Sequence, residues 1–93
     1  LPMERYFYVK NYAFDPTNSR IAQLSGYYTD LHHNFFFPPI EITRDEAIRM
    51  IKSGDVLFLE DGSYRKVKVK LIKSEDNNYL RVDHHVLASD YFG

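Results

Sequence analysis

The chain has 93 residues, of which 44% are hydrophobic and 16% aromatic, and its formal net charge is −1. This size and apolar content predict one folded domain with a core of its own, and they exclude a disordered chain. The absence of cysteine excludes disulfides, thiol catalysis and zinc ribbons, and the near-neutral charge excludes a global attraction to nucleic acid or membranes.

The hydropathy pattern and the first residues suggest where the protein acts. No apolar run is long enough to cross a membrane, and no charged-then-apolar signal pattern begins the chain. Leu1 and Pro2 precede Met3, so we interpret residues 1–2 as a cloning remnant and residues 3–93 as a single domain. We expect a cytoplasmic protein without a membrane partner.

The first predicted elements form a hairpin. Arg5–Phe14 is dense in Tyr, Phe and Val, which predicts a strand with neither face polar. Asp15–Ser19 predicts a turn, because proline fixes φ and Asp, Asn and Ser bond to nearby backbone. A second strand, Arg20–Ser25, is expected to pair antiparallel with the first and to end at Gly26.

Residues 26–39 are expected to form a long loop. A loop of this length in a small domain is usually functional or disordered, but disordered segments do not contain so many aromatic rings. The rings either cap an open end of the core or form a surface for partner binding or self-association. They belong to Tyr27, Tyr28, Phe35, Phe36 and Phe37.

A short capped helix follows. Thr43 and Glu46 have the spacing of a capping box, and Gly54 can adopt the left-handed conformation that ends a helix. The face expected to pack against the sheet carries Ala47, Ile48 and Ile51, with Met50 at its margin.

The rest of the chain predicts a three-stranded meander. Val56–Leu59 is a compact apolar run, and Asp61-Gly62 favours a type I′ hairpin turn. Tyr64–Lys73 alternates apolar and basic residues, which predicts one half-buried strand, and Tyr79–Val82 predicts the last one. The fold class is therefore α+β, with an antiparallel sheet of about five strands and one helix packed across one face, in the order β-β-α-β-β-β.

Several segments resemble a known family. They are SRIAQLSG at Ser19–Gly26, DEAIRMIKSG at Asp45–Gly54, RKVKVKLI at residues 65–72 and YLRVD at Tyr79–Asp83. With the aromatic first strand, they are similar to a family of small bacterial and archaeal proteins known as domain of unknown function 3892. The resemblance implies a fold and no established activity. The aromatic segment of residues 27–39 is longer than the link usual in that family, and the tail at residues 89–92 also departs from its pattern.

No catalytic or metal site is predicted. The pairs His32-His33 and His84-His85 could supply metal ligands, but neighbouring residues of an extended chain point in opposite directions, so each pair offers one ligand. We expect solvated or locally hydrogen-bonded histidines instead. Because the chain also lacks a nucleophile elbow, a phosphate loop and paired carboxylates in a known context, we expect no enzyme and no cofactor.

The favoured functional hypothesis is a small non-catalytic module that binds another protein. Surplus aromatic side chains indicate this, because they dominate the anchors of interfaces. Such a module would suit a phage- or plasmid-borne inhibitor of a host system, including host defence. A homodimer that buries the second face of the first strand is also reasonable. The predicted contact residues are Tyr27, Tyr28, Phe35, Phe36, Phe37, Tyr91 and Phe92.

The alternative hypothesis is a nucleic-acid-binding module with a basic hairpin strand. Lysines two residues apart would form a row that tracks phosphates. The competing interpretation is an ordinary solvated face, because the net charge is slightly negative and acidic residues flank the strand. Nucleic acid is therefore the less favoured partner. The residues concerned are Arg65, Lys66, Lys68 and Lys70.

Overall fold

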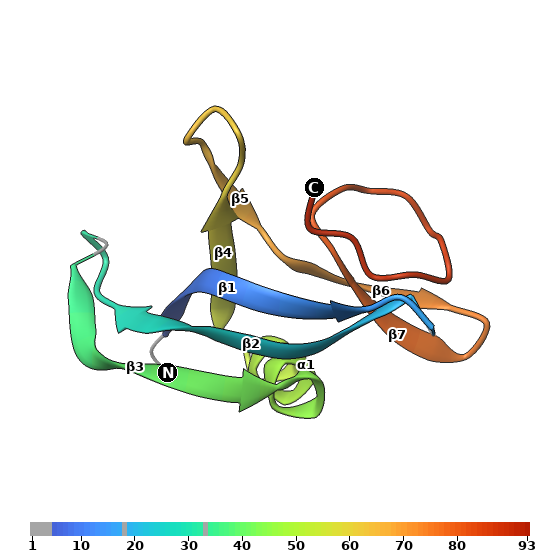
Figure 1. The fold of residues 1–93 in the computed structure, drawn as a ribbon, viewed down its shortest axis with the longest axis horizontal. Helices are drawn as coiled ribbons and strands as arrows, with labels where there is room; N and C mark the ends of the chain where they lie inside the picture. The colour runs from blue at the N-terminus through green and yellow to red at the C-terminus, as the bar shows by residue number, and fades with distance from the viewer. Residues whose placement is uncertain (1–4, 18, 33) are drawn as a thin grey trace.

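The computed structural model describes residues 5–17, 19–32 and 34–93 (Figure 1). The interpretation of residues 1–2, and of Met3 as the start, lies outside these residues. The elements in chain order are β1 (Tyr6–Asp15), β2 (Arg20–Thr29), β3 (Phe35–Thr43), α1 (Arg44–Lys52), β4 (Val56–Glu60), β5 (Lys66–Lys68), β6 (Lys70–Ser74) and β7 (Asn77–Arg81). The predicted α+β class, with a helix packed on a sheet, is confirmed.

The strands form a five-stranded sheet in the order β3-β2-β1-β4-β5 and a two-stranded sheet of β6 and β7. Four of the five pairings in the described part of the chain are antiparallel, but β4 runs parallel to β1. The prediction of a purely antiparallel sheet is wrong at this pair. A parallel neighbour needs a crossover connection, and α1 provides it between the edge strand β3 and the interior strand β4.

The ends of α1 follow the predicted rules. The Glu46 amide donates to Thr43 Oγ1 over 3.2 Å, and the Thr43 amide donates to Glu46 Oε1 over 3.1 Å, which completes the capping box. Gly54 has φ of +97° just beyond the C-cap residue Ser53. Ala47 and Met50 are the buried residues of the helix, so local capping and one apolar face together explain why it forms here.

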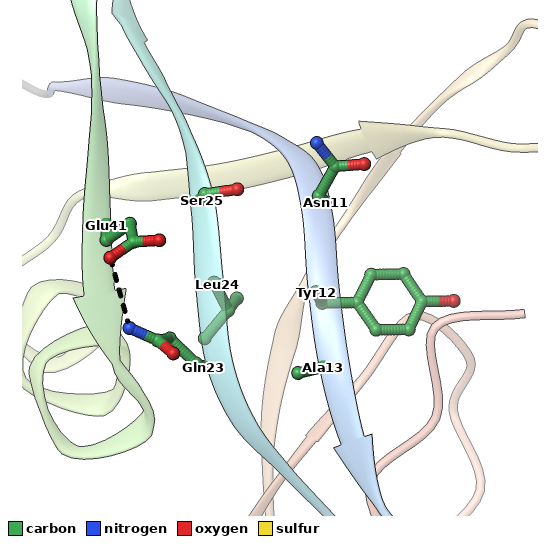
Figure 2. A pocket seen from close by; sticks show the side chains of 7 residues that line it. All are labelled: Asn11, Tyr12, Ala13, Gln23, Leu24, Ser25 and Glu41. Atoms are coloured by element: carbon green, nitrogen blue, oxygen red, sulfur yellow. Dashed lines mark hydrogen bonds between the residues drawn. The ribbon is translucent and has the colours of Figure 1, made fainter.

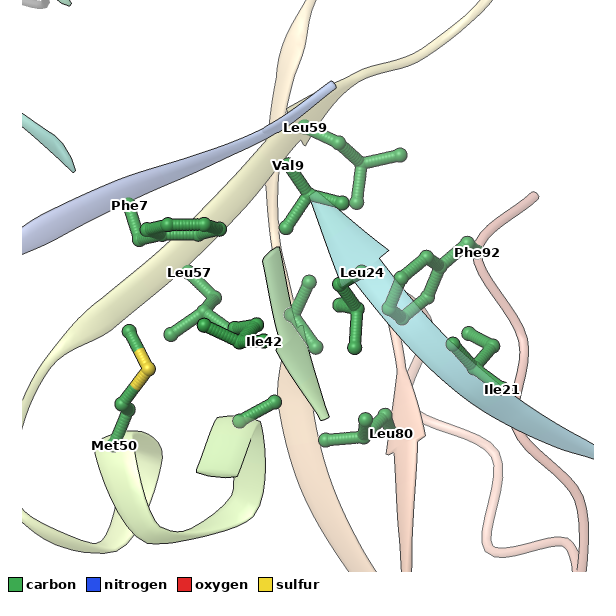
Figure 3. Packing of buried hydrophobic residues seen from close by; sticks show 12 residues of the cluster. Phe7, Val9, Ile21, Leu24, Ile42, Met50, Leu57, Leu59, Leu80 and Phe92 are labelled. Atoms are coloured by element: carbon green, nitrogen blue, oxygen red, sulfur yellow. The ribbon is translucent and has the colours of Figure 1, made fainter. Parts of the chain in front are cut away.

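The core lies between the five-stranded sheet on one side and α1 with β6 and β7 on the other. Figure 3 shows side chains from β1, β2, β3, β4 and β7 meeting above the helix. Phe92 packs into this cluster from the C-terminal tail. The sheet therefore buries one face, and the tail is part of the fold. The labelled side chains are Phe7, Val9, Ile21, Leu24, Ile42, Met50, Leu57, Leu59, Leu80 and Phe92.

The segment predicted as a loop after Gly26 is instead a hairpin. β2 continues through Gly26 to Thr29, and β3 begins at Phe35, so the connection is short. A Cβ on Gly26 would lie 1.8 Å from the Tyr8 carbonyl oxygen, so the glycine is there because β1 approaches closely, and it does not end the strand. β3 tolerates Pro38 and Pro39 because it is an edge strand.

The predicted strand Tyr64–Lys73 is in fact two strands. The chain leaves the five-stranded sheet after β5, and β6 pairs with β7 in the second sheet. The predicted type I′ turn at Asp61-Gly62 is also wrong, because the connection spans residues 61–65 and Tyr64 has the positive φ. A tight two-residue turn occurs instead at Glu75 and Asp76, with φ of 53° and 64°.

Candidate protein-interaction face

The five-stranded sheet has a second face on the side away from α1, which we call the open face (Figure 1). Successive side chains of a strand point to opposite faces, so Tyr8, which lies between the buried Phe7 and Val9, points to the open face. The same alternation places Phe58, between the core residues Leu57 and Leu59, on the open face.

Five aromatic rings form a continuous row on the open face. Phe35 stacks between Tyr27 and Tyr8, with centroid distances of 4.9 and 5.2 Å and interplanar angles of 5° and 7°. Phe37 meets Tyr27 edge-on at 5.0 Å, and Phe58 lies 5.4 Å from Tyr8 at a tilt of 40°. We call Phe37, Tyr27, Phe35, Tyr8 and Phe58 the aromatic row. It crosses four strands, β3, β2, β1 and β4.

The aromatic row becomes more exposed toward the edge strand β3. Phe58 is buried, Phe35 is 41% exposed and Phe37 is 74% exposed. Rings stacked at these small angles cover each other's faces, so edges are what they offer to solvent. The open face therefore presents an apolar surface whose rings are most exposed at the β3 edge.

Charged side chains surround the aromatic row. The Lys10 ammonium lies 5.9 Å from the Tyr27 ring centroid. Burial, and then the neighbouring carboxylate of Glu60, raise the pKa of the Tyr8 hydroxyl, so this phenol stays neutral at physiological pH. Lys66 and Lys68 pair in register with Glu60 and Phe58, which places them on the open face at the β5 edge.

The other half of the open face is polar and shallowly hollowed. A cavity of about 200 Å³ lies here, and its polar lining includes Asn11, Gln23, Ser25 and Glu41. Figure 2 shows these side chains. Gln23 Nε2 donates to Glu41 Oε2 over 3.4 Å across β2 and β3. A neighbouring hollow of about 270 Å³ reaches from Glu41 to Tyr27 and Lys10. Glu41 is exposed, so its carboxylate can make further contacts.

The predicted contact residues divide among three places. Tyr27, Phe35 and Phe37 lie on the open face, as described above. Tyr28 and Phe36 pair with each other and point to the opposite face, where Tyr28 meets Phe7 edge-on at 5.3 Å. Two residues of the row, Tyr8 and Phe58, were missed by sequence reasoning, because they join it through the pairing of distant strands.

The two predicted tail contacts have structural roles. Phe92 is 6% exposed and belongs to the core, so we do not count it as a contact residue. Tyr91 is partly exposed, and its ring lies 5.0 Å from the Arg81 guanidinium carbon. Tyr91 also forms a bridge with Arg81 beside β7. The tail is therefore an added edge of the small sheet, and its last residues, Phe92 and Gly93, line a hollow together with Tyr8 of the aromatic row.

The predicted basic stripe is divided. Lys66 and Lys68 lie on the open face of β5, but Lys70 belongs to β6, where its ammonium donates to the Val82 carbonyl over 3.4 Å. Arg65 lies in the preceding loop and forms an exposed ion pair with Asp61 at 3.5 Å. The prediction that the lysines form one row on one sheet face is therefore wrong beyond Lys68.

The described residues contain no cluster of three or more His, Cys, Asp or Glu side chains arranged to hold a metal ion. They also contain no helix that is both long enough and apolar enough to cross a membrane. Comparisons with protein-family models, with curated proteins and with solved structures find no significant match to this chain. The resemblance to the domain of unknown function 3892 family stays a prediction.

Proposed function

We propose that this chain is a non-catalytic protein-binding module and that the open face is its binding surface. The observation that carries the proposal is the aromatic row, which runs over four strands and ends in the 74% exposed Phe37. Single exposed apolar residues are ordinary, but a contiguous exposed aromatic surface is typical of an interaction site.

The ring geometry favours a protein over nucleic acid as the partner. A nucleobase stacks on the free face of an aromatic ring. Phe35 has a ring on each side, Tyr27 has Phe35 on one side and Lys10 and Phe37 nearby, and Tyr8 lies between Phe35 and Phe58. The stacked rings therefore offer mainly their edges, which suit apolar side chains of a polypeptide. Phe37, which is 74% exposed and meets Tyr27 edge-on, is the ring of the row with an open face for a base.

Nucleic acid has a second observation in its favour, because Lys66 and Lys68 share the open face with the aromatic row. Counterion release would then give an affinity that falls steeply with added salt. The proposed role as a phage- or plasmid-borne inhibitor of a host system rests on size and class alone. This role would require a host protein that binds the open face and loses its own activity when it is bound.

The adjacent residues Phe36 and Phe37 provide a matched test. Phe37 is on the open face, whereas Phe36 is 56% exposed and points to the opposite face. A benzophenone amino acid placed at either position would be irradiated in a lysate of the organism that encodes the chain. We expect a nuclease-resistant polypeptide adduct from position 37 and much less from position 36. Equal adducts from both positions, no polypeptide adduct at 37, or loss of the adduct with nuclease would overturn the proposal.

A further inference from the structure

We propose that a second copy of this chain can occupy the open face, in a twofold dimer in which Glu41 of each copy faces Lys66 of the other. This inference rests on the proposed function of the open face as a protein-binding surface and names one partner for it.

Glu41 and Lys66 occupy opposite edges of the open face. Glu41 is on the edge strand β3, and Lys66 is on the other edge strand, β5. Both lie at about the same height along the strands. Tyr8 pairs with Tyr27 on one side and with Phe58 on the other, so these three residues mark one level across the sheet. Glu41 pairs with Ser25, which is two residues from Tyr27 along β2. Lys66 pairs with Glu60, which is two residues from Phe58 along β4 and on the same side of that level. The sheet thus carries Glu41 at one edge and, level with it at the other edge, Lys66, which together with Lys68 outnumbers the acid Glu60 beside it.

A twofold axis parallel to the strands and near β1 converts this arrangement into a self-complementary one. Face-to-face packing about such an axis exchanges the two edges and keeps the height, so the Glu41 edge of one copy meets the Lys66 edge of its partner. The aromatic row, which is centred on β1 and β2, would pack against its own copy. This one arrangement forms both Glu41–Lys66 contacts and buries the aromatic row between the two copies.

The area of the open face is in the range of a modest dimer interface. The five strands have 10, 10, 9, 5 and 3 residues, and each strand residue covers about 3.3 Å by 4.8 Å of a sheet. The face therefore covers roughly 600 Å², against about 800 Å² per partner in a standard interface. We therefore expect a dimer that dissociates in the micromolar range.

The test is sedimentation velocity of the full chain, with Glu41→Lys, Lys66→Glu, and an equimolar mixture of the two variants. Each variant alone puts like charges at both contacts, so we expect its dimer to dissociate about tenfold more readily than the wild type. In a mixed dimer, the lysine introduced into one variant meets the glutamate introduced into the other, and the native Glu41 and Lys66 meet at the second contact. The mixture should therefore recover dimers of wild-type strength.

Lys73→Glu is the matched control, because Lys73 is an exposed lysine of the other sheet, and it should leave the dimer unchanged. Glu41 and Lys66 are both exposed, so their variants should fold, and circular dichroism checks this. A wild type that stays monomeric up to high micromolar concentration, or variants that dimerise as the wild type does, would overturn the inference. So would a mixture that fails to recover. An adduct from position 37 to a different polypeptide would in that case leave the proposed function standing.

Discussion

Asp90 shows how a single residue holds the tail, the helix and both sheets together. Its Oδ2 accepts from the Ile21 amide of β2 at 2.7 Å, and its Oδ1 accepts from the Leu80 amide of β7 at 2.8 Å. Arg44, the first residue of α1, donates to both oxygens at 2.9 and 3.0 Å. The carboxylate is fully buried, so each of these donors depends on it.

We expect Asp90→Ala to destabilise the fold by about 3–5 kcal/mol. The substitution leaves the Arg44 guanidinium without its partner carboxylate and two buried amides without acceptors, and such losses are costly away from water. Urea unfolding followed by circular dichroism measures the change. Leu87→Ala is the control in the same tail, and because Leu87 is half exposed it should change stability by much less. Equal midpoints for the two variants would contradict this account of Asp90.

At the scale of the element, the turn between β6 and β7 has two consecutive non-glycine residues in the left-handed region. Glu75 and Asp76 both have positive φ, and Ser74 pairs with Asn77 across the turn. This is the geometry of a type I′ turn, which favours Asn-Gly. A residue with a Cβ loses roughly 1–2 kcal/mol in the left-handed region. The local sequence is therefore a poor match to its own backbone.

Replacing Glu75-Asp76 with Asn-Gly should raise the free energy of unfolding by about 1 kcal/mol. The gain would appear as a higher urea midpoint with an unchanged slope. Replacing the same pair with Ala-Ala keeps the strain and removes the side chains, so it should give no gain. If Asn-Gly and Ala-Ala behave alike, turn strain is not what limits this hairpin.

Elements whose signals are local could be predicted from the sequence. The helix ends follow from Thr43, Glu46 and Gly54, and the β1–β2 hairpin follows from Asp15–Ser19. β3 was missed because Pro38-Pro39 argues against a strand unless it is known to lie at an edge. The break at Val69 was missed because apolar and basic residues alternate without interruption from β5 into β6. Edges and sheet boundaries depend on distant partners.

The same limit applies to the candidate site. Tyr27, Phe35 and Phe37 stand out as aromatic residues in one segment, but Tyr8 and Phe58 join them only through pairing with β2 and with β1. Register also separates Phe36 from Phe37 and places them on opposite faces. A hydrophobic count cannot show which rings of a segment share a surface.

At the scale of the whole molecule, the sheet uses its two faces differently. One face carries the aliphatic core and is covered by α1, β7 and the tail residue Phe92. The other carries the aromatic row and is left with exposed rings at its β3 edge. The first strand, β1, has apolar residues on both faces for this reason: Phe7 and Val9 serve the core, and Tyr8 serves the open face.

Four loops of the molecule share a feature: in each of them an aspartate carboxylate accepts a hydrogen bond from a backbone amide of the same loop. Asp15, Asp30 and Asp61 each accept from an amide two residues later, and Asp83 accepts from the His85 amide. Hydrogen bonds hold the pKa of each of these carboxyls below its usual range. For Asp83 the main cause is the bidentate bond from Arg81, which lowers the pKa to about 2.

These lowered pKa values predict that acid destabilises the whole fold. A carboxyl whose pKa is lower in the folded state contributes stability that is fully present above its unfolded pKa, about 3.9, and is lost as the pH falls through the folded value. For Asp83 this window runs from about pH 4 down to about pH 2. We therefore expect the urea midpoint of the wild type to fall across this window. Asp83→Asn should start lower at pH 7 and fall less steeply, because it has lost one of the titrating groups. Parallel curves for the two proteins would show that Arg81 and Asp83 do not contribute to the acid sensitivity.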